Sequence, residues 1–171
     1  MDRSRPPALT PEESLLDTAR FSAAHAGLCL DAPDSLAWLV TGTVLLAQQA
    51  AALALKAAGD AIPAQVGAAE ILLRAASKDR LTAPYTLPFG SGQRRDFDLL
   101  VVARNGFMHP RAGSWHVTSR TLARGLPVAT GAVRHLILTQ PILPDLISPA
   151  AQDGLQDCLE QIEAVAEFFR D

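Results

Sequence analysis

The sequence predicts an all-α protein, a four- or five-helix up-and-down bundle with short additional helices. Aromatic residues make up only 5% of the 171 residues, and alanine, the strongest helix former, is abundant. Apolar residues also recur every three or four positions in several segments, which is the period of an amphipathic helix. A chain of this length buries roughly two thirds of its unfolded surface, so we expect one domain, at residues 10–171. Residues 1–9 are expected to form a flexible N-terminus.

The first helix is expected over residues 11–28. A capping box marks its start, because the side chains of Thr10 and Glu13 are spaced to accept each other's backbone N–H, and Pro11 suits the first helical position. His25 lies on or near the moderate apolar stripe of this helix, and we interpret it as a structural residue.

The second helix, over residues 35–58, has no charged side chain from Ser35 to Leu55. About 20 apolar residues are enough to cross a membrane, so a transmembrane segment is the competing interpretation. Threonines, glutamines and many alanines make this segment only weakly hydrophobic, and a central helix surrounded by other helices explains it better. We therefore expect no membrane association. Without an export signal at the N-terminus, the expected location is the cytoplasm.

The rest of the chain continues the helical pattern. A loop at 81–92 contains several prolines and glycines, and we interpret Tyr85 in it as a packed anchor. Trp115 is expected to close a turn over the core, and Pro127 is expected to separate two helices. Cys29 and Cys158 have no metal-ligand spacing, so we expect both to be small buried residues. The further helices are predicted at residues 64–77, 94–108, 119–126, 128–140 and 150–170.

The helix expected over residues 94–108 carries the candidate site. Its apolar residues recur at helical spacing, and Arg104 falls on the same stripe, where an arginine needs a partner or a purpose. The β-prone run at 99–102 makes a buried strand the competing interpretation. Pro110 disfavours helical geometry at His109, so this histidine is expected to project from the helix end.

Positive charge is concentrated around this helix. Six arginines and two aspartates lie between residues 94 and 124, a balance of +4, whereas seven carboxylates and two arginines follow residue 124, a balance of −5. Local positive charge is typical of a surface that binds a phosphate chain. Arg94, Arg95 and Arg111 are therefore candidate substrate-binding residues.

The spacing of Arg104 and His109 is by itself a weak signal, because two other arginines are also followed five positions later by histidine. These are the pairs Arg20/His25 and Arg111/His116. Context separates the three, since Asn105 directly follows Arg104 and the pair ends an apolar helix pattern. In this form the run from Arg104 to His109, Arg-Asn-Gly-Phe-Met-His, resembles the Arg-(four to six residues)-His motif of the HEPN (higher eukaryotes and prokaryotes nucleotide-binding) superfamily. That motif usually has Asn, Asp or His after the arginine.

The resemblance implies a HEPN-like helical domain over residues 10–171 that forms a homodimer with both motifs in one cleft. Many members are metal-independent endoribonucleases of toxin–antitoxin or phage-defence systems, so RNA is the expected substrate, a cognate antitoxin protein is a further expected partner, and no metal or other cofactor is expected. In the implied reaction the ribose 2′-OH attacks the adjacent phosphorus, which leaves a 2′,3′-cyclic phosphate and a 5′-OH.

The three catalytic residues implied by the resemblance have chemically suitable side chains. His109 is a general acid or base near neutral pH, Arg104 stabilises charge on phosphoryl oxygens, and Asn105 orients the histidine or a phosphate. Five helical positions place Arg104 and His109 roughly 140° apart. The two side chains therefore meet within one chain only if the helix end unwinds, and a second protomer supplies the alternative.

One HEPN subgroup has a tyrosine two residues after the histidine that a partner can nucleotidylate, but this chain has Arg111 there, so that regulation is not expected. The alternative function is a non-catalytic helical module that dimerises or binds nucleotide or a protein partner. In that case Arg104 is expected to pair with Asp98 or another carboxylate, and His109 is expected to cap the helix end.

Overall fold

The computed structural model describes residues 9–109 and 115–170, so nearly all of the expected flexible N-terminus and the candidate residue Arg111 lie outside the described residues. The all-α prediction is confirmed, because the regular elements in the described ranges are six α-helices and one π-helical segment, with no strand. These elements are α1 (Pro11–Leu28), α2 (Pro33–Ala57), α3 (Ala68–Ala75), α4 (Ser91–Met108), α5 (Ser119–Val133), η1 (Arg134–Thr139) and α6 (Pro149–Phe168).

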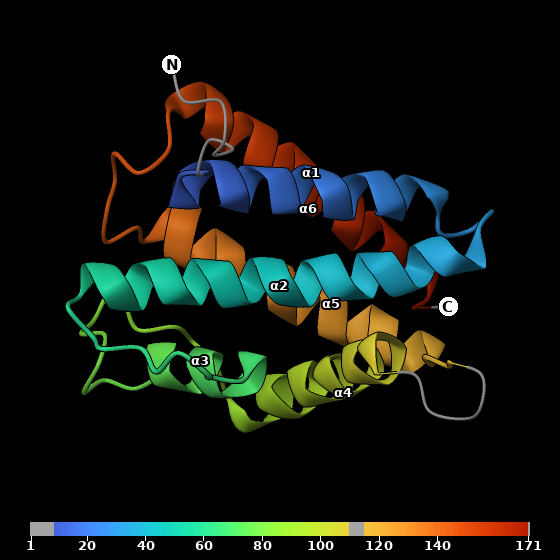
Figure 1. Cartoon of the computed structure of the whole chain (residues 1–171), viewed down its shortest axis with the longest axis horizontal. Coiled ribbons are helices and arrows are strands. Elements are labelled where there is room, and N and C mark those ends of the chain that lie inside the picture. Colours follow the sequence, from blue (N-terminus) through green and yellow to red (C-terminus); the bar gives the residue numbers. More distant parts are fainter. Residues whose placement is uncertain (1–8, 110–114, 171) are drawn as a thin grey trace, which may run out of the picture.

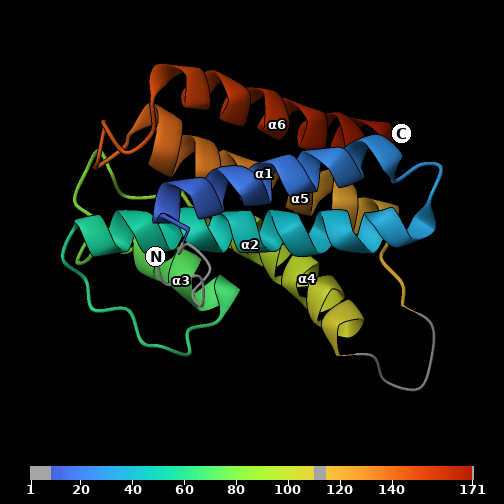
Figure 2. The same cartoon turned by 45° about the horizontal axis from the view of Figure 1, so that its top comes forward.

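The helices run in alternating directions along the long axis of the molecule. Figures 1 and 2 show α1, α4 and α6 running one way and α2 and α5 running the other way. The central helix α2 contacts α1, α3, α4 and α5, whereas α6 packs against α1 and α5. The helix α4 therefore lies on the side of α2 away from α6, and its C-terminal end reaches one end of the bundle (Figure 1).

The packing of α2 explains its apolar sequence. Among the described residues it is the one helix that is long and apolar enough to cross a membrane, and more than half of its apolar window is buried inside the molecule. Leu39, Val40, Leu46 and Leu55 are almost completely buried by the neighbouring helices. A central helix surrounded by others, as the sequence analysis expected, accounts for this composition.

Several local predictions are confirmed. The Thr10 hydroxyl accepts the Glu13 N–H at 3.1 Å, and the Glu13 carboxylate accepts the Thr10 N–H at 2.7 Å, which completes the capping box of α1. Cys29 and Cys158 are free and buried, and Tyr85 packs against the core. Some boundaries differ, since α3 is shorter than expected and α4 begins three residues earlier, at Ser91.

The prediction of two helices separated at Pro127 is wrong. The proline lies inside α5, which runs without a break and continues into η1, where the Gln140 N–H donates to the His135 carbonyl at 2.8 Å. A proline in a helix interior costs about 3 kcal/mol. Buried apolar side chains on both sides of it, including Leu122, Leu126 and Val133, each stabilise the folded state by about 1.5 to 3 kcal/mol and outweigh that cost.

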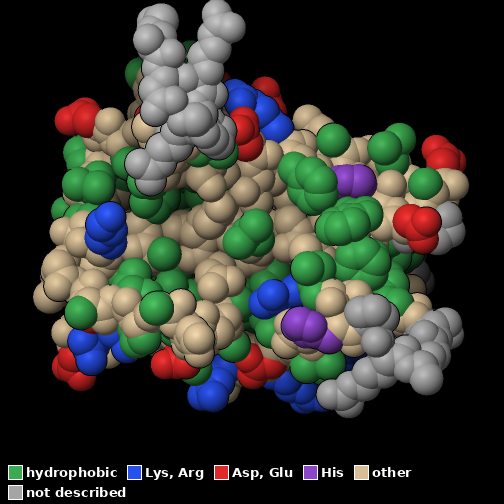
Figure 3. All heavy atoms as spheres, viewed as in Figure 1, with side chains coloured by type: hydrophobic (Ala, Val, Ile, Leu, Met, Phe, Trp, Pro, Cys, Tyr) green, Lys and Arg blue, Asp and Glu red, His purple; other side chains and the backbone are tan. Residues whose placement is uncertain are grey.

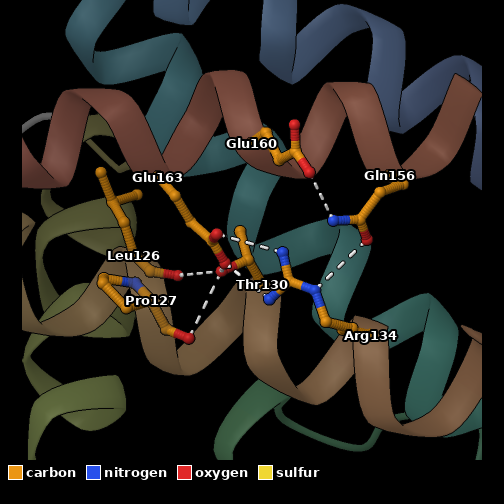
Figure 4. A network of polar contacts seen from close by, with 7 residues as sticks. All are labelled: Leu126, Pro127, Thr130, Arg134, Gln156, Glu160 and Glu163. Atoms are coloured by element: carbon orange, nitrogen blue, oxygen red, sulfur yellow. Dashed lines mark hydrogen bonds and ion pairs between the residues drawn. The ribbon is translucent and has the colours of Figure 1, made fainter. Parts of the chain in front are cut away.

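A polar network joins α6 to the end of α5. Arg134 donates two hydrogen bonds to the Glu163 carboxylate at 2.8 and 3.0 Å, and the Thr130 hydroxyl donates a third at 2.6 Å (Figure 4). Arg134 also donates to the Gln156 side chain, which in turn donates to Glu160. Burial of Glu163 opposes its ionisation, but the bonds from Arg134 and Thr130 and the charge of Arg134 outweigh burial, and the pKa of Glu163 is lowered.

The helices α4 and α5 are in close contact at Gly125. A Cβ atom there would lie 3.1 Å from the Asp96 carbonyl oxygen and 3.1 Å from the Leu100 Cβ. Beside this contact Arg124 pairs with the Asp96 carboxylate at 3.1 Å. The absence of a side chain at Gly125 therefore sets how closely α4 can approach the bundle.

Replacing Glu163 by Gln is expected to lower the free energy of unfolding at pH 7 by about 1 to 3 kcal/mol, because the charged partner of Arg134 is lost. Since the pKa of Glu163 is lowered from its usual 4.5, its contribution is fully present above pH 4.5 and is lost as pH falls through the folded-state pKa. Urea unfolding across this range is expected to show the wild type and Glu163→Gln converging at low pH. The exposed Glu160→Gln is the control, with a change under about 0.5 kcal/mol; equal effects of the two variants would contradict the account.

Alanine at Gly125 and alanine at Gly131, both in α5, are expected to have opposite effects. Gly125→Ala forces α4 away from α5 and is expected to lower the free energy of unfolding by about 1 to 3 kcal/mol. A Cβ at Gly131 meets nothing within 4 Å, so Gly131→Ala is expected to raise it by about 0.5 to 1 kcal/mol through helix propensity. Denaturant titration of both variants measures the difference, and a stabilising Gly125→Ala would refute the close contact.

Candidate functional site

The buried face of α4 ends just before the candidate residues. Phe97 and Leu100 are fully buried and Ala103 is nearly so, whereas Arg104 is half-buried and Asn105 is exposed. This segment is helical, so the strand interpretation of residues 99–102 is wrong. The buried face also does not extend to Met108, the last residue of the helix, which is exposed.

Arg104 has no partner among the residues that the structure describes. Its Nε atom is buried without a hydrogen-bond partner, and the side chain forms no ion pair in the described ranges. Asp98, the carboxylate expected to hold Arg104 in a structural role, lies 3.9 Å from Arg94 instead. An arginine that is half-buried and unpaired keeps its hydrogen-bonding capacity for a ligand, which distinguishes Arg104 from Arg124 and Arg134.

His109 is the exposed residue that ends α4. Its backbone N–H donates to the Asn105 carbonyl at 3.0 Å, so the helix remains wound through Met108. Five positions of an ideal helix correspond to roughly 140°, but His109 itself has φ −125° and ψ 70°, which is not helical backbone. The described residues show no hydrogen bond between them, and Pro110, which was expected to release His109, lies outside the described residues.

Aromatic residues from three segments hold the end of α4. The Trp115 Nε1–H donates to the Ala103 carbonyl at 2.7 Å, and its ring lies 3.6 Å from where a Cβ of Gly106 would be. Phe107 lies between Trp115 and Trp38, with ring centroids 6.0 and 4.9 Å away. Sequence reasoning identified only Trp115, because Trp38 and Phe107 are far apart in the chain and no local pattern links them.

The candidate substrate-binding residues that the structure describes lie at the other end of α4. At 1.5 Å per residue, Arg94 and Arg95 are about 14 to 15 Å from Arg104 along the helix axis. Arg95 is exposed, and Arg94 is loosely paired with Asp98. The structure thus brings Arg104, Asn105 and His109 together at one helix end but does not bring Arg94 and Arg95 to it.

The described residues supply few other reactive groups. They contain no group of three or more His, Cys, Asp or Glu side chains that could hold a metal ion. Burial raises the pKa of the Cys29 and Cys158 thiols, which keeps both in the unreactive protonated form at neutral pH. The end of α4 is therefore the strongest candidate site in the described part of the chain.

Comparisons of the chain with models of protein families, with curated proteins and with solved structures find no match. A functional assignment for this protein therefore has to be argued from the residues of the site.

Replacing Arg104 by Met is expected to leave the free energy of unfolding unchanged or to raise it by up to about 1 kcal/mol, because the substitution removes a buried Nε–H that has no partner. Arg134→Met is the matched control and is expected to lower it by about 1 to 3 kcal/mol, since it leaves the Glu163 carboxylate without its bidentate partner. Chemical denaturation of the two variants tests this contrast. An equal loss in both would mean that Arg104 has a structural role.

Proposed function

We propose that the protein is a metal-independent endoribonuclease that acts as a homodimer through Arg104 and His109. The observation that carries the proposal is the pairing of an arginine that has no carboxylate partner with an exposed histidine at the same helix end. This combination fits the Arg-Asn-x3-His motif, and the all-α bundle with the motif at the C-terminal end of a helix fits the HEPN resemblance.

Each residue has a defined role in the proposed reaction. A histidine exchanges protons near neutral pH, so His109 removes the proton of the ribose 2′-OH or donates one to the leaving 5′-oxygen. Arg104 binds the phosphoryl oxygens as negative charge develops on them. Asn105 is exposed one turn before His109 and orients the imidazole or the phosphate. The products are a 2′,3′-cyclic phosphate and a 5′-OH, and no metal ion is required.

The dimer is part of the proposal because α4 remains wound. Because five positions of an ideal helix separate two side chains by roughly 140°, we assign one active site to Arg104 of one protomer and His109 of its partner. Leu99 and Val102 are 44% and 66% exposed, and Asn105 and His109 continue the same side of α4 at helical spacing. This partly apolar stripe offers a surface for a second copy of the chain.

The alternative is a non-catalytic module that uses the same stripe to dimerise or to bind a protein or nucleotide. The unpaired Arg104 argues against a module that serves only as a protein interface, because such a helix has no need for an arginine without a partner. The proposed setting is the cytoplasm, in a toxin–antitoxin or phage-defence system with a cognate antitoxin protein as partner.

The purified protein is expected to cleave RNA in the presence of EDTA and to leave 2′,3′-cyclic phosphate ends. Arg104→Ala and His109→Ala are each expected to reduce the rate by about 100-fold or more, with the fold intact. Arg20→Ala is the control, since Arg20 belongs to another Arg/His pair of equal spacing but is exposed and bonded to Asp17. Gel electrophoresis measures the cleavage rate, and mass spectrometry identifies the ends of the products. Cleavage by both motif variants at the wild-type rate would refute the proposal.

A further inference from the structure

Aromatic side chains, which are rare in this protein, gather beside the candidate site. Phe21 of α1, Trp38 of α2 and Phe107 of α4 form a chain of edge contacts, with ring centroids 6.1 and 4.9 Å apart. His25 joins this cluster, with its ring centroid 4.5 Å from that of Phe21. With aromatic residues at only 5% of the sequence, such a cluster across three helices is a distinct feature of the surface.

Two of these rings are open to solvent although they are held in fixed positions. Phe21 is 42% and Trp38 is 40% exposed, while Phe107 and His25 are half-buried beside them. Figure 3 shows hydrophobic side chains gathered over the right-hand parts of α1, α2 and α4, with histidine and basic side chains among and beside them. Rings that are supported by neighbours and exposed on the other side are typical of surfaces on which bases stack.

The aromatic surface is continuous with the proposed active site. Phe107 follows Arg104 by three positions, so both residues lie on the same side of α4. The guanidinium of Arg104 has no carboxylate partner in the described residues, whereas the exposed Asp34 lies one turn before Trp38 on α2. Arg104 places a positive charge on one side of the rings, and Asp34 places a negative charge on the other side. A phosphate is therefore favoured at Arg104 and disfavoured beyond Trp38.

We propose that Trp38, supported by Phe21, is a stacking site for an unpaired nucleobase of the RNA whose phosphate contacts Arg104. This inference rests on the proposed function and adds a substrate class to it. A base that is paired within a duplex is stacked on its neighbours and is not available to a protein side chain, whereas bases of single strands, loops and bulges are available. The site therefore selects single-stranded RNA over duplex RNA.

A second copy of the chain is the competing occupant of this surface, and Leu45 separates the two cases. Leu45 follows Trp38 by two helical turns on the same side of α2 and is 44% exposed. A protein interface over this side of α2 would use both residues for their apolar area. A stacking site uses the aromatic ring of Trp38 and not the aliphatic side chain of Leu45.

The test is binding of a fluorescent single-stranded 2′-O-methyl oligonucleotide, which cannot be cleaved because its 2′-oxygen is blocked. Trp38→Ala is expected to weaken binding by about 5- to 150-fold, the range found for removing one base-stacking side chain. Trp38→Tyr is expected to retain most of the affinity for the single strand, and Leu45→Ala is expected to retain all of it. The corresponding duplex is expected to bind the wild type and Trp38→Ala with equal affinity. Fluorescence anisotropy measures these affinities, and size-exclusion chromatography of each variant measures the oligomeric state.

A second measurement covers the case in which Trp38→Ala folds poorly. The single strand is expected to quench the tryptophan fluorescence of the wild type, whereas the duplex is not. Trp38→Phe, which keeps an aromatic ring at this position, is expected to abolish the quenching. Unchanged binding by folded Trp38→Ala, absence of quenching, or loss of the dimer in both Trp38→Ala and Leu45→Ala would overturn the inference. Binding that depends on Trp38 without any RNA cleavage would refute only the ribonuclease, whereas cleavage with unchanged binding in Trp38→Ala would refute only the stacking site.

Discussion

The site depends on one constraint, which is that α4 stays helical to Met108 although its buried face ends at Ala103. The last turn thus extends beyond the core while its backbone direction remains fixed. Arg104 is half-buried at the edge of the core and His109 is exposed at the helix end. Because the helix does not unwind before Met108, we propose that a second protomer completes the site.

Other contacts in the fold keep this helix end in place and pair several of the charged groups. Gly125 allows α5 to approach the backbone of α4, and the Trp115 indole binds the Ala103 carbonyl. Elsewhere Arg134 is held by Glu163, and the hydrogen bond from Arg74 lowers the pKa of Asp60. In the described part of the chain the half-buried Arg104 differs from these paired groups, which is why its position at the helix end indicates a ligand.

Helices and caps that follow from local patterns were predicted from the sequence. Contacts between residues that are distant in the chain were not. The capping box at Thr10 and the apolar period fixed α1, and the same period placed Arg104 and His109 at the end of α4. Pro127 misled the prediction, because burial of side chains on both sides of it outweighs a local preference. No sequence pattern linked Trp38 to Phe107, since this contact follows from the packing of α2 against α4. The pair Arg94 and Asp98, by contrast, has i,i+4 spacing, a local pattern that the sequence does contain.

The central claim is that Arg104 of one protomer acts with His109 of its partner, and mixing two inactive variants tests it most directly. Arg104→Ala and His109→Ala are unfolded together, refolded as mixed dimers and assayed for RNA cleavage in EDTA. Random pairing makes half of the dimers mixed, each with one intact site, so the account predicts recovery of about a quarter of the wild-type rate. No recovery in mixtures that contain mixed dimers would contradict it.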